Sequence, residues 1–327
     1  MMAQFLKSRD VMLAGVILLL LVGIGIINPR FVQPGNLVEV FNDSSILIMV
    51  ALAQMLVILT KCIDLSVSAN IALTGMIVAM LNFYYPEIPV AALIAIAIIA
   101  GGMLGAINGL FIWKLGIPSI VVTLGTMSVY RGSVFLLSGG AWINAHQMSD
   151  AFKAVPRTVI LGLPVLGWIG ILTVLLIAVF LKMTRLGRSL YAAGGNPTAA
   201  VYAGIDVGRS RFYAYTIGGA IAGLAGYLWV SRYAVAYVEI AQGFELDTVA
   251  ACVIGGISIA GGIGSVVGGV LGALFLGIVK NALPVIHISP FWQMAISGAV
   301  IIVAVVINAR SERKVGRLIL KEAQVHA

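Results

Sequence analysis

Apolar segments alternate with short polar ones along almost the whole chain. An α-helix needs about 17–25 mostly apolar residues to cross a bilayer. Ten segments meet or approach this length, although the one at residues 248–260 is too short to cross alone. The pattern predicts an all-α polytopic membrane protein with about ten transmembrane helices in one domain, residues 1–327. The expected spans are residues 11–27, 44–60, 65–81, 90–113, 117–137, 165–183, 212–231, 248–260, 263–279 and 291–308.

Composition leads to the same class of protein. Hydrophobic residues make up 61% of the chain and charged residues only 10%, whereas soluble domains carry about 25% charged residues. So little polar surface cannot cover a globule in water. The stretch "NPRFVQPGN" after the first apolar segment offers no small-residue cleavage site. That segment is therefore expected to remain as an anchor rather than to act as a signal peptide.

The basic residues predict the orientation. Ten crossings place both termini on one side, and with both in the cytoplasm fourteen of the twenty Lys and Arg residues face the cytoplasm. This excess follows the positive-inside rule, and it accounts for the net charge of +8 without a nucleic-acid partner. The six basic residues expected on the outer side are Arg30, Arg131, Lys153, Arg157, Arg232 and Lys280.

Glycines spaced four residues apart recur in three predicted spans. Small residues let membrane helices approach each other closely, so each stripe is expected to face another helix. The stripes are Gly264, Gly268 and Gly272; Gly101, Gly105 and Gly109; and Gly219 with Gly223.

Two glycine pairs lie within or directly after the short segment 248–260. Gly255 and Gly256 stand within it, and Gly261 and Gly262 directly follow it. Irregular backbone at membrane depth is tolerated where it lines a cavity or is buried in protein. The pairs therefore indicate either a short or interrupted helix near a transport pathway or a tight turn between two helices.

A short stretch that occurs twice in the chain indicates an internal repeat. The stretch "GGMLGA" at residues 101–106 recurs as "GGVLGA" at 268–273, and Asp64 and Asp247 precede the two copies. The two spans run in opposite directions in the predicted topology, which is the pattern of an inverted repeat in transporters. Chance recurrence in a chain rich in Gly and Ala is the alternative.

The motifs of soluble catalysis do not occur in this sequence. Residues 262–268, "GIGSVVG", imitate a dinucleotide-binding turn, but Val267 stands at the position of its last glycine. No phosphate-binding loop, H-E-x-x-H or G-x-S-x-G motif is present. Cys62 and Cys252 have no metal-ligand spacing. The chain is expected to be no enzyme and to bind neither a cofactor nor a metal, with any ATP hydrolysis in a separate subunit.

Four stretches, in order, cover most of the chain: "CIDLSVSANIALTGM", "IPSIVVTLGTMSVYRG", "GRSLYAAGGNPTAAVYAGIDV" and "FELDTVAACVIGGISIAGGIGSVVGGVLGA". Together they resemble the permease subunits of ribose-type ATP-binding cassette (ABC) sugar importers. The run "YRG…GGAWI" resembles the rhamnose and autoinducer-2 branch most. Lys61 and Cys62 stand where the family usually has two glycines, so the local backbone geometry is expected to differ there.

This resemblance implies a multi-pass protein of the bacterial inner membrane that carries rhamnose, ribose, autoinducer-2 or a similar molecule. It implies three partners: a second copy of the permease or a related one, an ATPase with two nucleotide-binding halves, and a periplasmic sugar-binding protein. The alternatives are a gradient-driven transporter of a small polar solute and an intramembrane enzyme. The first usually needs an ionisable residue at mid-membrane, whereas Asp64, Arg131 and Asp247 are expected near span ends. The second lacks a nucleophile with a base.

The loop 184–211 is the expected coupling element for the ATPase. Asn196 and Pro197 have the residue types of a helix start, and Gly204 that of a helix end. Small residues there would permit close contact with a soluble partner; the alternative is an ordinary loop helix. The expected coupling residues are Gly187, Ala192, Ala193, Gly194, Asn196, Ala199, Ala200, Gly204 and Ile205.

A neutral sugar requires hydroxyl and amide partners along its path. Arg131 is expected to reach the outer interface in a structural role, with sugar contact as the alternative. For Asp64, the alternatives to a role in the path are an ion pair with Lys61 and a helix cap. Outer charges at Arg30, Lys153, Arg157, Arg232, Glu239 and Glu245 either meet the binding protein or are solvated. The expected path residues are Asp64, Ser66, Ser68, Asn70, Asn108, Thr123, Gly255 and Gly256.

Overall fold

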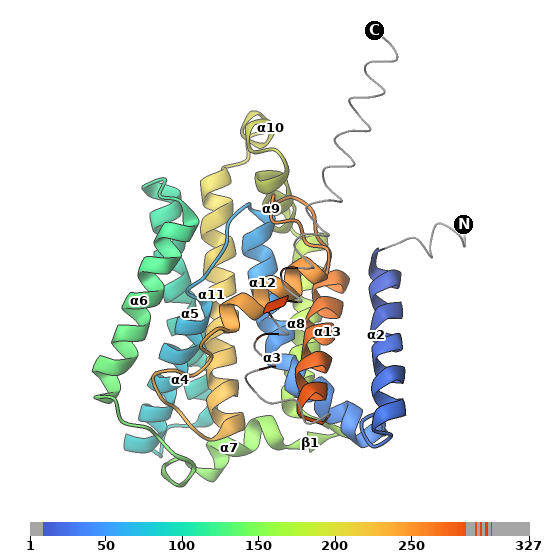
Figure 1. Ribbon diagram of the computed structural model, residues 1–327. Coiled ribbons are helices and arrows are strands. Elements are labelled where there is room, and N and C mark those ends of the chain that lie inside the picture. The colour runs from blue at the N-terminus through green and yellow to red at the C-terminus, as the bar shows by residue number, and fades with distance from the viewer. Residues whose placement is uncertain (1–8, 286–291, 293–294, 296–297, 300–301, 303–327) are drawn as a thin grey trace.

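The computed structural model describes residues 9–285, 292, 295, 298–299 and 302 (Figure 1). Helices dominate these ranges, and the one sheet within them is a two-stranded antiparallel hairpin. The expected all-α polytopic fold is therefore present. Its elements are α2 (Arg9–Ile27), α3 (Pro34–Leu59), α4 (Val67–Tyr84), α5 (Val90–Lys114), α6 (Ser119–Ser138), η1 (Ala145–Gln147), α7 (Asp150–Arg157), β1 (Val159–Ile160), β2 (Leu163–Pro164), α8 (Val165–Met183), α9 (Arg185–Gly195), α10 (Pro197–Tyr202), α11 (Val207–Tyr233), α12 (Phe244–Ile254) and α13 (Val266–Val285).

Seven helices in the described ranges are long and apolar enough to cross a membrane: α2, α3, α4, α5, α6, α8 and α13. The count of ten spans is therefore not reached there. The 27-residue helix α11 is not among the seven, because its Arg, Gly and Tyr residues lower its mean hydropathy. The expected span 291–308 lies outside the described residues except for isolated positions.

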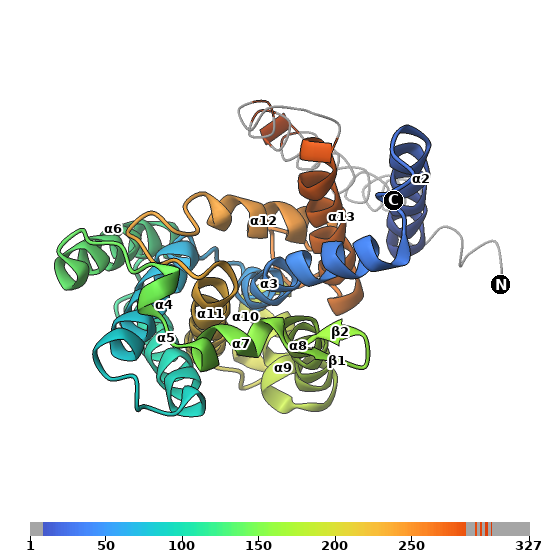
Figure 2. The same cartoon turned by 90° about the horizontal axis from the view of Figure 1, so that it is seen from below.

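The helix α3 begins ten residues before the expected span 44–60. Pro34 stands in its first turn, where proline is favoured because the N–H groups have no helical partner. Of the residues in the apolar part of α3, 94% are buried. Figure 2 places this helix beside α11 in the middle of the bundle. Because the first residues of α3 are polar, hydropathy did not indicate where the helix begins.

Glycines bring α5 and α11 into backbone contact. A Cβ atom on Gly105 would overlap the carbonyl oxygen of Tyr215, and Gly101 lies in the same way against Gly219 and Gly223. The two predicted stripes are thus confirmed as a shared packing surface between helices. Bulkier residues would separate the helices and lose the dispersion contacts that hold them together.

The third stripe packs α13 against α12. Cβ atoms on Gly268 and Gly272 would overlap the carbonyl oxygens of Gly255 and Ala251, respectively. Gly264 precedes α13 and meets a side chain instead of backbone. The stripe is therefore confirmed for two of its three members.

The helix α12 is short and ends early, so the span expected at residues 248–260 is wrong at both ends. Gly256 takes a left-handed φ of 80°. Its N–H donates to the Val253 oxygen at 3.0 Å, while the N–H of Ile257 donates to Cys252 at 2.9 Å. This pair of bonds is a Schellman motif, which ends a helix where glycine permits positive φ. The structure thus shows the short helix of the first alternative, while a transport pathway beside it stays a prediction.

The two ends of the helix bundle carry different short elements (Figure 1). The α9–α10 end carries those two short helices, and the α7 end carries α7 and the hairpin. Gly262 donates its N–H to the Leu59 oxygen at 3.0 Å, so the irregular chain after α12 reaches the α9–α10 end. At the other end, the Tyr227 hydroxyl donates to the Phe152 carbonyl of α7 at 3.1 Å. The sequence had assigned residues 138–164 to a loop without this helix.

Candidate functional site

A buried polar network lies where the chain between α3 and α4 meets α5. The Asp64 side chain is buried, and its Oδ1 accepts hydrogen bonds from the Ser66 N–H at 2.8 Å and the Ser66 hydroxyl at 2.6 Å. The Asn108 amide donates to the Ser66 hydroxyl oxygen at 2.8 Å. Within the described ranges, Asp64 forms no ion pair with Lys61. Three expected path residues are therefore linked directly.

The other expected path residues surround this network at different distances. The Asn70 amide donates to the Gly101 carbonyl at 3.1 Å, and the Thr123 hydroxyl donates to Ser119 at 2.9 Å within α6. Gly255 and Gly256 lie elsewhere, against α13 and the Arg9 side chain. The side-chain oxygens of Ser68, Asn70 and Asn108 have no hydrogen-bond partner in the described part of the chain.

Lys61 occupies the left-handed backbone region, with φ of 64°. Glycine adopts this conformation without steric cost, whereas other residues lose about 1–2 kcal/mol there. The backbone thus keeps a geometry that suits glycine although the residue is lysine.

A first cavity, called the α6 cavity, has a volume of about 500 Å³ and lies between α4, α6 and the segment before α12. Ser68, Gln242 and Glu245 line it together with Arg131. The Arg131 guanidinium donates to the carbonyl oxygens of Val238 at 2.7 Å and Ile240 at 2.8 Å. Arg131 therefore holds this segment in place, which agrees with the structural role expected for it.

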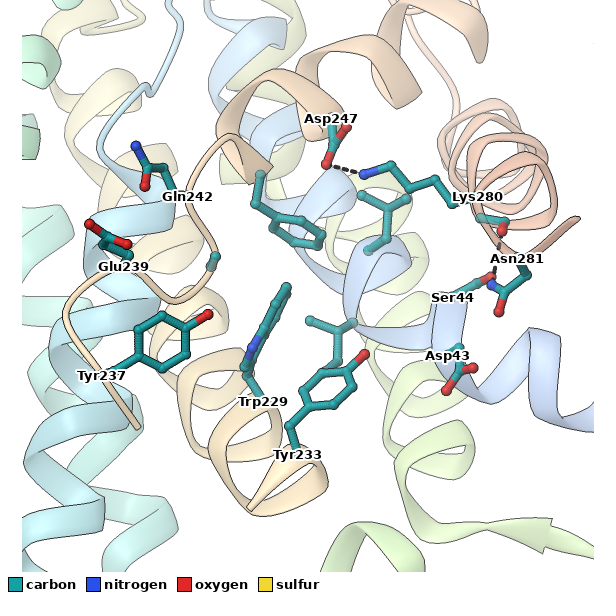
Figure 3. Close-up of a pocket in the computed structure, with 15 residues that line it drawn as sticks. Asp43, Ser44, Trp229, Tyr233, Tyr237, Glu239, Gln242, Asp247, Lys280 and Asn281 are labelled. Carbon is teal, nitrogen blue, oxygen red and sulfur yellow. Dashed lines mark hydrogen bonds and ion pairs between the residues drawn. The ribbon is translucent and has the colours of Figure 1, made fainter. Parts of the chain in front are cut away.

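A second cavity, called the α13 cavity, has a volume of about 440 Å³ and lies between α3, α11, α12 and α13 (Figure 3). Trp229, Tyr233 and Tyr237 present their rings to it. Lys280 and Asp247 form an ion pair across its upper wall. Sequence reasoning had treated Asp247 as a residue near the end of a span and missed the pairing.

The segment 237–242 is a common wall of the two cavities. Glu239 and Gln242 line both of them. Besides Arg131, a backbone bridge between Ile143 and Ala236 holds this wall, with both N···O distances at 2.9 Å. The wall is irregular chain rather than helix, so a few side-chain contacts decide its position.

The expected coupling helix is present. It is α10, capped by the Asn196 side chain, which accepts from the Ala199 N–H at 3.0 Å. Gly204 follows it with φ of 77°. The preceding helix α9 was not expected, and the Thr184 hydroxyl caps it by accepting from the Gly187 N–H at 2.9 Å.

The expected coupling residues divide into an inner and an outer set. Gly187, Ala193, Gly194 and Ala200 are buried inside the chain, so Ala200 is not available for the partner contact expected of it. The exposed positions of the set are Asn196, Ala199 and Gly204, while Ala192 and Ile205 are half-buried.

Two large exposed residues were missed at this end. Val201 is 61% exposed and Tyr202 is 88% exposed on α10. Large apolar side chains beside a helix-ending glycine were the available signal. Behind them, the Tyr191 hydroxyl donates to the Gly264 carbonyl at 3.1 Å, and burial raises the pKa of the Tyr191 phenol. This contact ties α9 to the irregular chain before α13.

Residues 36–305 match the family model described as "Branched-chain amino acid transport system / permease component". The chain belongs to this permease family. The "Autoinducer 2 import system permease protein LsrC" of Enterobacter sp. (strain 638) is 37% identical over 317 residues, covering 97% of this chain and 91% of that protein. The protein of the same name from Escherichia coli O157:H7 is 33% identical over 310 residues, covering 94% and 90%. No solved structure matches the chain.

The charges at the α7 end of this permease are used largely within the chain. Arg232 pairs with Asp43 and, at 3.4 Å, with Glu39. Arg157 donates to the Arg232 carbonyl at 2.7 Å, and Lys153 pairs with Asp150 at 3.0 Å. Lys153, Arg157 and Arg232 thus have partners within the chain, which neither alternative, docking or solvation, had included. Glu239 and Glu245 line the cavities instead.

Proposed function

We propose that this permease is the membrane subunit of an ABC importer for a sugar or sugar-like molecule such as rhamnose, ribose or autoinducer-2. The observation that carries the proposal is its similarity along nearly the full chain to permeases named for autoinducer 2 import. The sequence contains no phosphate-binding loop. ATP hydrolysis is therefore assigned to a separate subunit.

The α9–α10 end is the proposed contact for an ATPase with two nucleotide-binding halves. Tyr202 and Val201 project there from a short capped helix, which suits a groove in a soluble partner. A periplasmic binding protein would dock at the opposite, α7 end, and a second copy or a related permease would complete the channel. Basic residues at the α9–α10 end, among them Lys114, Arg185 and Arg188, support a cytoplasmic location for it. Both termini are then cytoplasmic in a bacterial inner membrane.

A solute path beside the α6 cavity is proposed from the polar network. Ser66, Asn70, Asn108 and Thr123 offer hydroxyl and amide groups around Asp64, and Ser68 faces the cavity itself. Unpartnered buried oxygens cost free energy unless a ligand or water satisfies them. A solute rich in hydroxyl groups provides that satisfaction as it passes.

Ten spans with an inverted repeat remain part of the proposal. One packing relationship and one feature of the chain order support the repeat. The helix α5 packs on α11 as α13 packs on α3, and both α4 and α12 follow stretches of irregular chain. The helices α4 and α12 also pack against the glycine-bearing helices that follow them, α5 and α13 respectively. An inverted repeat would relate these pairs by a two-fold axis in the membrane plane.

Two other functions remain in view. The family description names branched-chain amino acids, and these are zwitterions that require paired charges at their binding site. A gradient-driven transporter would use a buried carboxylate. Asp64 lies between α3 and α4, and Asp247 lies in the first turn of α12, so both stand near helix ends as expected, although the Asp64 side chain is buried. Asp247, however, is already neutralised by Lys280.

The decisive experiment is reconstitution of the permease with its ATPase and binding protein in vesicles. We expect uptake of labelled ribose, rhamnose or autoinducer-2 that requires ATP and all components, and no ATP hydrolysis by the purified permease alone. Uptake of leucine in preference to the sugars would replace the solute assignment. Uptake driven by a proton or sodium gradient without ATP would overturn the importer assignment.

A further inference from the structure

We propose that the α13 cavity is a binding site for a neutral polyhydroxylated molecule of monosaccharide size. It is a site separate from the path residues around Asp64, and its part in transport rests on the function proposed above. Its volume of about 440 Å³ lies within the range of about 300–1,000 Å³ that is typical of small-molecule sites.

Aromatic rings form one side of this cavity. Trp229 packs edge-on against Phe244, with ring centroids 5.0 Å apart, and this contact fixes the indole plane. Tyr237 stacks on Trp142 at 4.5 Å, which leaves its hydroxyl toward the cavity (Figure 3). Rigid aromatic faces pack against the C–H groups of a sugar ring, and their polar edges remain free for hydrogen bonds.

Five polar side chains around the cavity lack hydrogen-bond partners in the described part of the chain. The indole N–H of Trp229 and the hydroxyls of Tyr233 and Tyr237 make no hydrogen bond there, nor do the side chains of Glu239 and Gln242. They include donors and acceptors from α11 and from the segment 237–242. A molecule with several hydroxyl groups, each both donor and acceptor, can satisfy them together.

The charges of the lining favour a neutral ligand over a cation. Asp247 is paired with Lys280, and Asp43 is paired with Arg232. Glu239 stands on the shared wall, where the positive charge of Arg131 acts on it from the α6 side. An aromatic cage with unpaired carboxylates would recognise a quaternary ammonium group, but these carboxylates are offset by basic side chains.

The shared wall connects this site to the proposed path. Gln242 faces both cavities, so displacement of the segment 237–242 would join them. The α13 cavity lies between the half of α3 near its first residues and the end of α11, toward the α7 end (Figures 1 and 3). A solute arriving from the α7 end would therefore meet this site before the network around Asp64.

The test is calorimetric titration of the full-length permease in lipid nanodiscs, without ATPase or binding protein. The probes are D-ribose, L-rhamnose and D-glucitol, with choline and L-leucine for comparison. We expect at least one of the three polyols to bind at one site per chain, with choline and leucine at least tenfold weaker. Preferential binding of choline or leucine, or no binding of any polyol at millimolar concentration, would overturn the proposal.

Variants locate the binding. Tyr233 lines only the α13 cavity and is 51% exposed, and Tyr85 is 53% exposed and lines neither cavity. Tyr233→Leu should weaken polyol binding at least tenfold, whereas Tyr85→Leu should leave it within twofold. Phe135→Leu, in the α6 cavity, should also leave it within twofold. Loss of binding in Phe135→Leu with retention in Tyr233→Leu would assign the ligand to the α6 cavity and overturn the proposal.

The result is separable from the proposed function. ATP-driven sugar uptake by the reconstituted system without polyol binding to the isolated permease would refute the site and leave the importer assignment intact. Polyol binding that is abolished by Tyr233→Leu, in a system without ATP-driven uptake, would support the site and refute the importer assignment.

Discussion

Lys280 of α13 forms an ion pair with Asp247 of α12 inside the bundle, and these residues come from helices held together by a glycine seam. The Asp247 side chain is 14% exposed and that of Lys280 37% exposed. Breaking such a pair leaves one charge buried without compensation, which usually costs more than the pair itself contributes. The pair therefore locks the contact of α12 with α13 at one wall of the α13 cavity.

Removal of the positive partner should destabilise the permease. Lys280→Met is expected to lose about 1–3 kcal/mol, less than a fully buried pair because water reaches the lysine. The double variant with Asp247→Asn should recover part of that loss. Thermal unfolding in detergent measures both, with Asp150→Asn, at the fully exposed carboxylate of the Lys153 pair, as a control near zero. Equal stability of Lys280→Met and the parent protein would show that the pair does not lock the helices.

The glycine seam between α12 and α13 should not accept even a methyl group. Gly268→Ala is expected to cost about 1–3 kcal/mol from overpacking, against a gain in helix propensity of about 1 kcal/mol. Gly23→Ala in α2, where no atom lies within 4 Å of the added carbon, should be neutral or stabilising. Yields of folded protein and melting temperatures distinguish the two. The same result for both variants would mean that the seam is looser than the structure indicates.

Arg131 should control the mobility of the wall between the cavities. Arg131→Met removes two hydrogen bonds to carbonyl groups, each worth about 1.5–3 kcal/mol when the donor is charged. Hydrogen exchange in residues 234–243 should become at least tenfold faster, while exchange in α5 stays unchanged. Arg30→Met serves as the control for loss of a basic side chain. Unaltered exchange in the wall would assign its order to other contacts.

Contact with the ATPase should depend on Tyr202 rather than on Ala200. Tyr202→Glu is expected to reduce co-purification with the ATPase at least tenfold and to leave the melting temperature unchanged, because the side chain is 88% exposed. Leu161→Glu, at a residue that is 90% exposed at the opposite end, should retain docking. Ala200→Glu should instead lower the melting temperature, since Ala200 is buried. Normal docking of Tyr202→Glu would move the coupling contact to another segment of the α9–α10 end.

Local physical rules allowed several elements to be predicted from the sequence. Membrane insertion depends on the apolar content of single segments, so α5 and α8 were located within a residue or two. A helix cap depends on neighbours three residues away, so the helix after Asn196 was also found. Glycine spacing indicated which faces pack, because close approach requires the absence of a Cβ atom on one side.

The tertiary structure alone decided which partners those faces and charges meet. Asp247 pairs with Lys280, which stands 33 residues later in the chain. Arg131 donates to carbonyl oxygens of residues more than a hundred positions away. Ala200 and Tyr202 are close in sequence, yet one is buried and the other exposed, because the docking of α10 on α9 determines which side faces inward. The α13 cavity likewise depends on the relative placement of four helices. Sequence patterns indicate which faces each segment must bury and which charges it must pair. Long-range packing decides which other segment provides the partner.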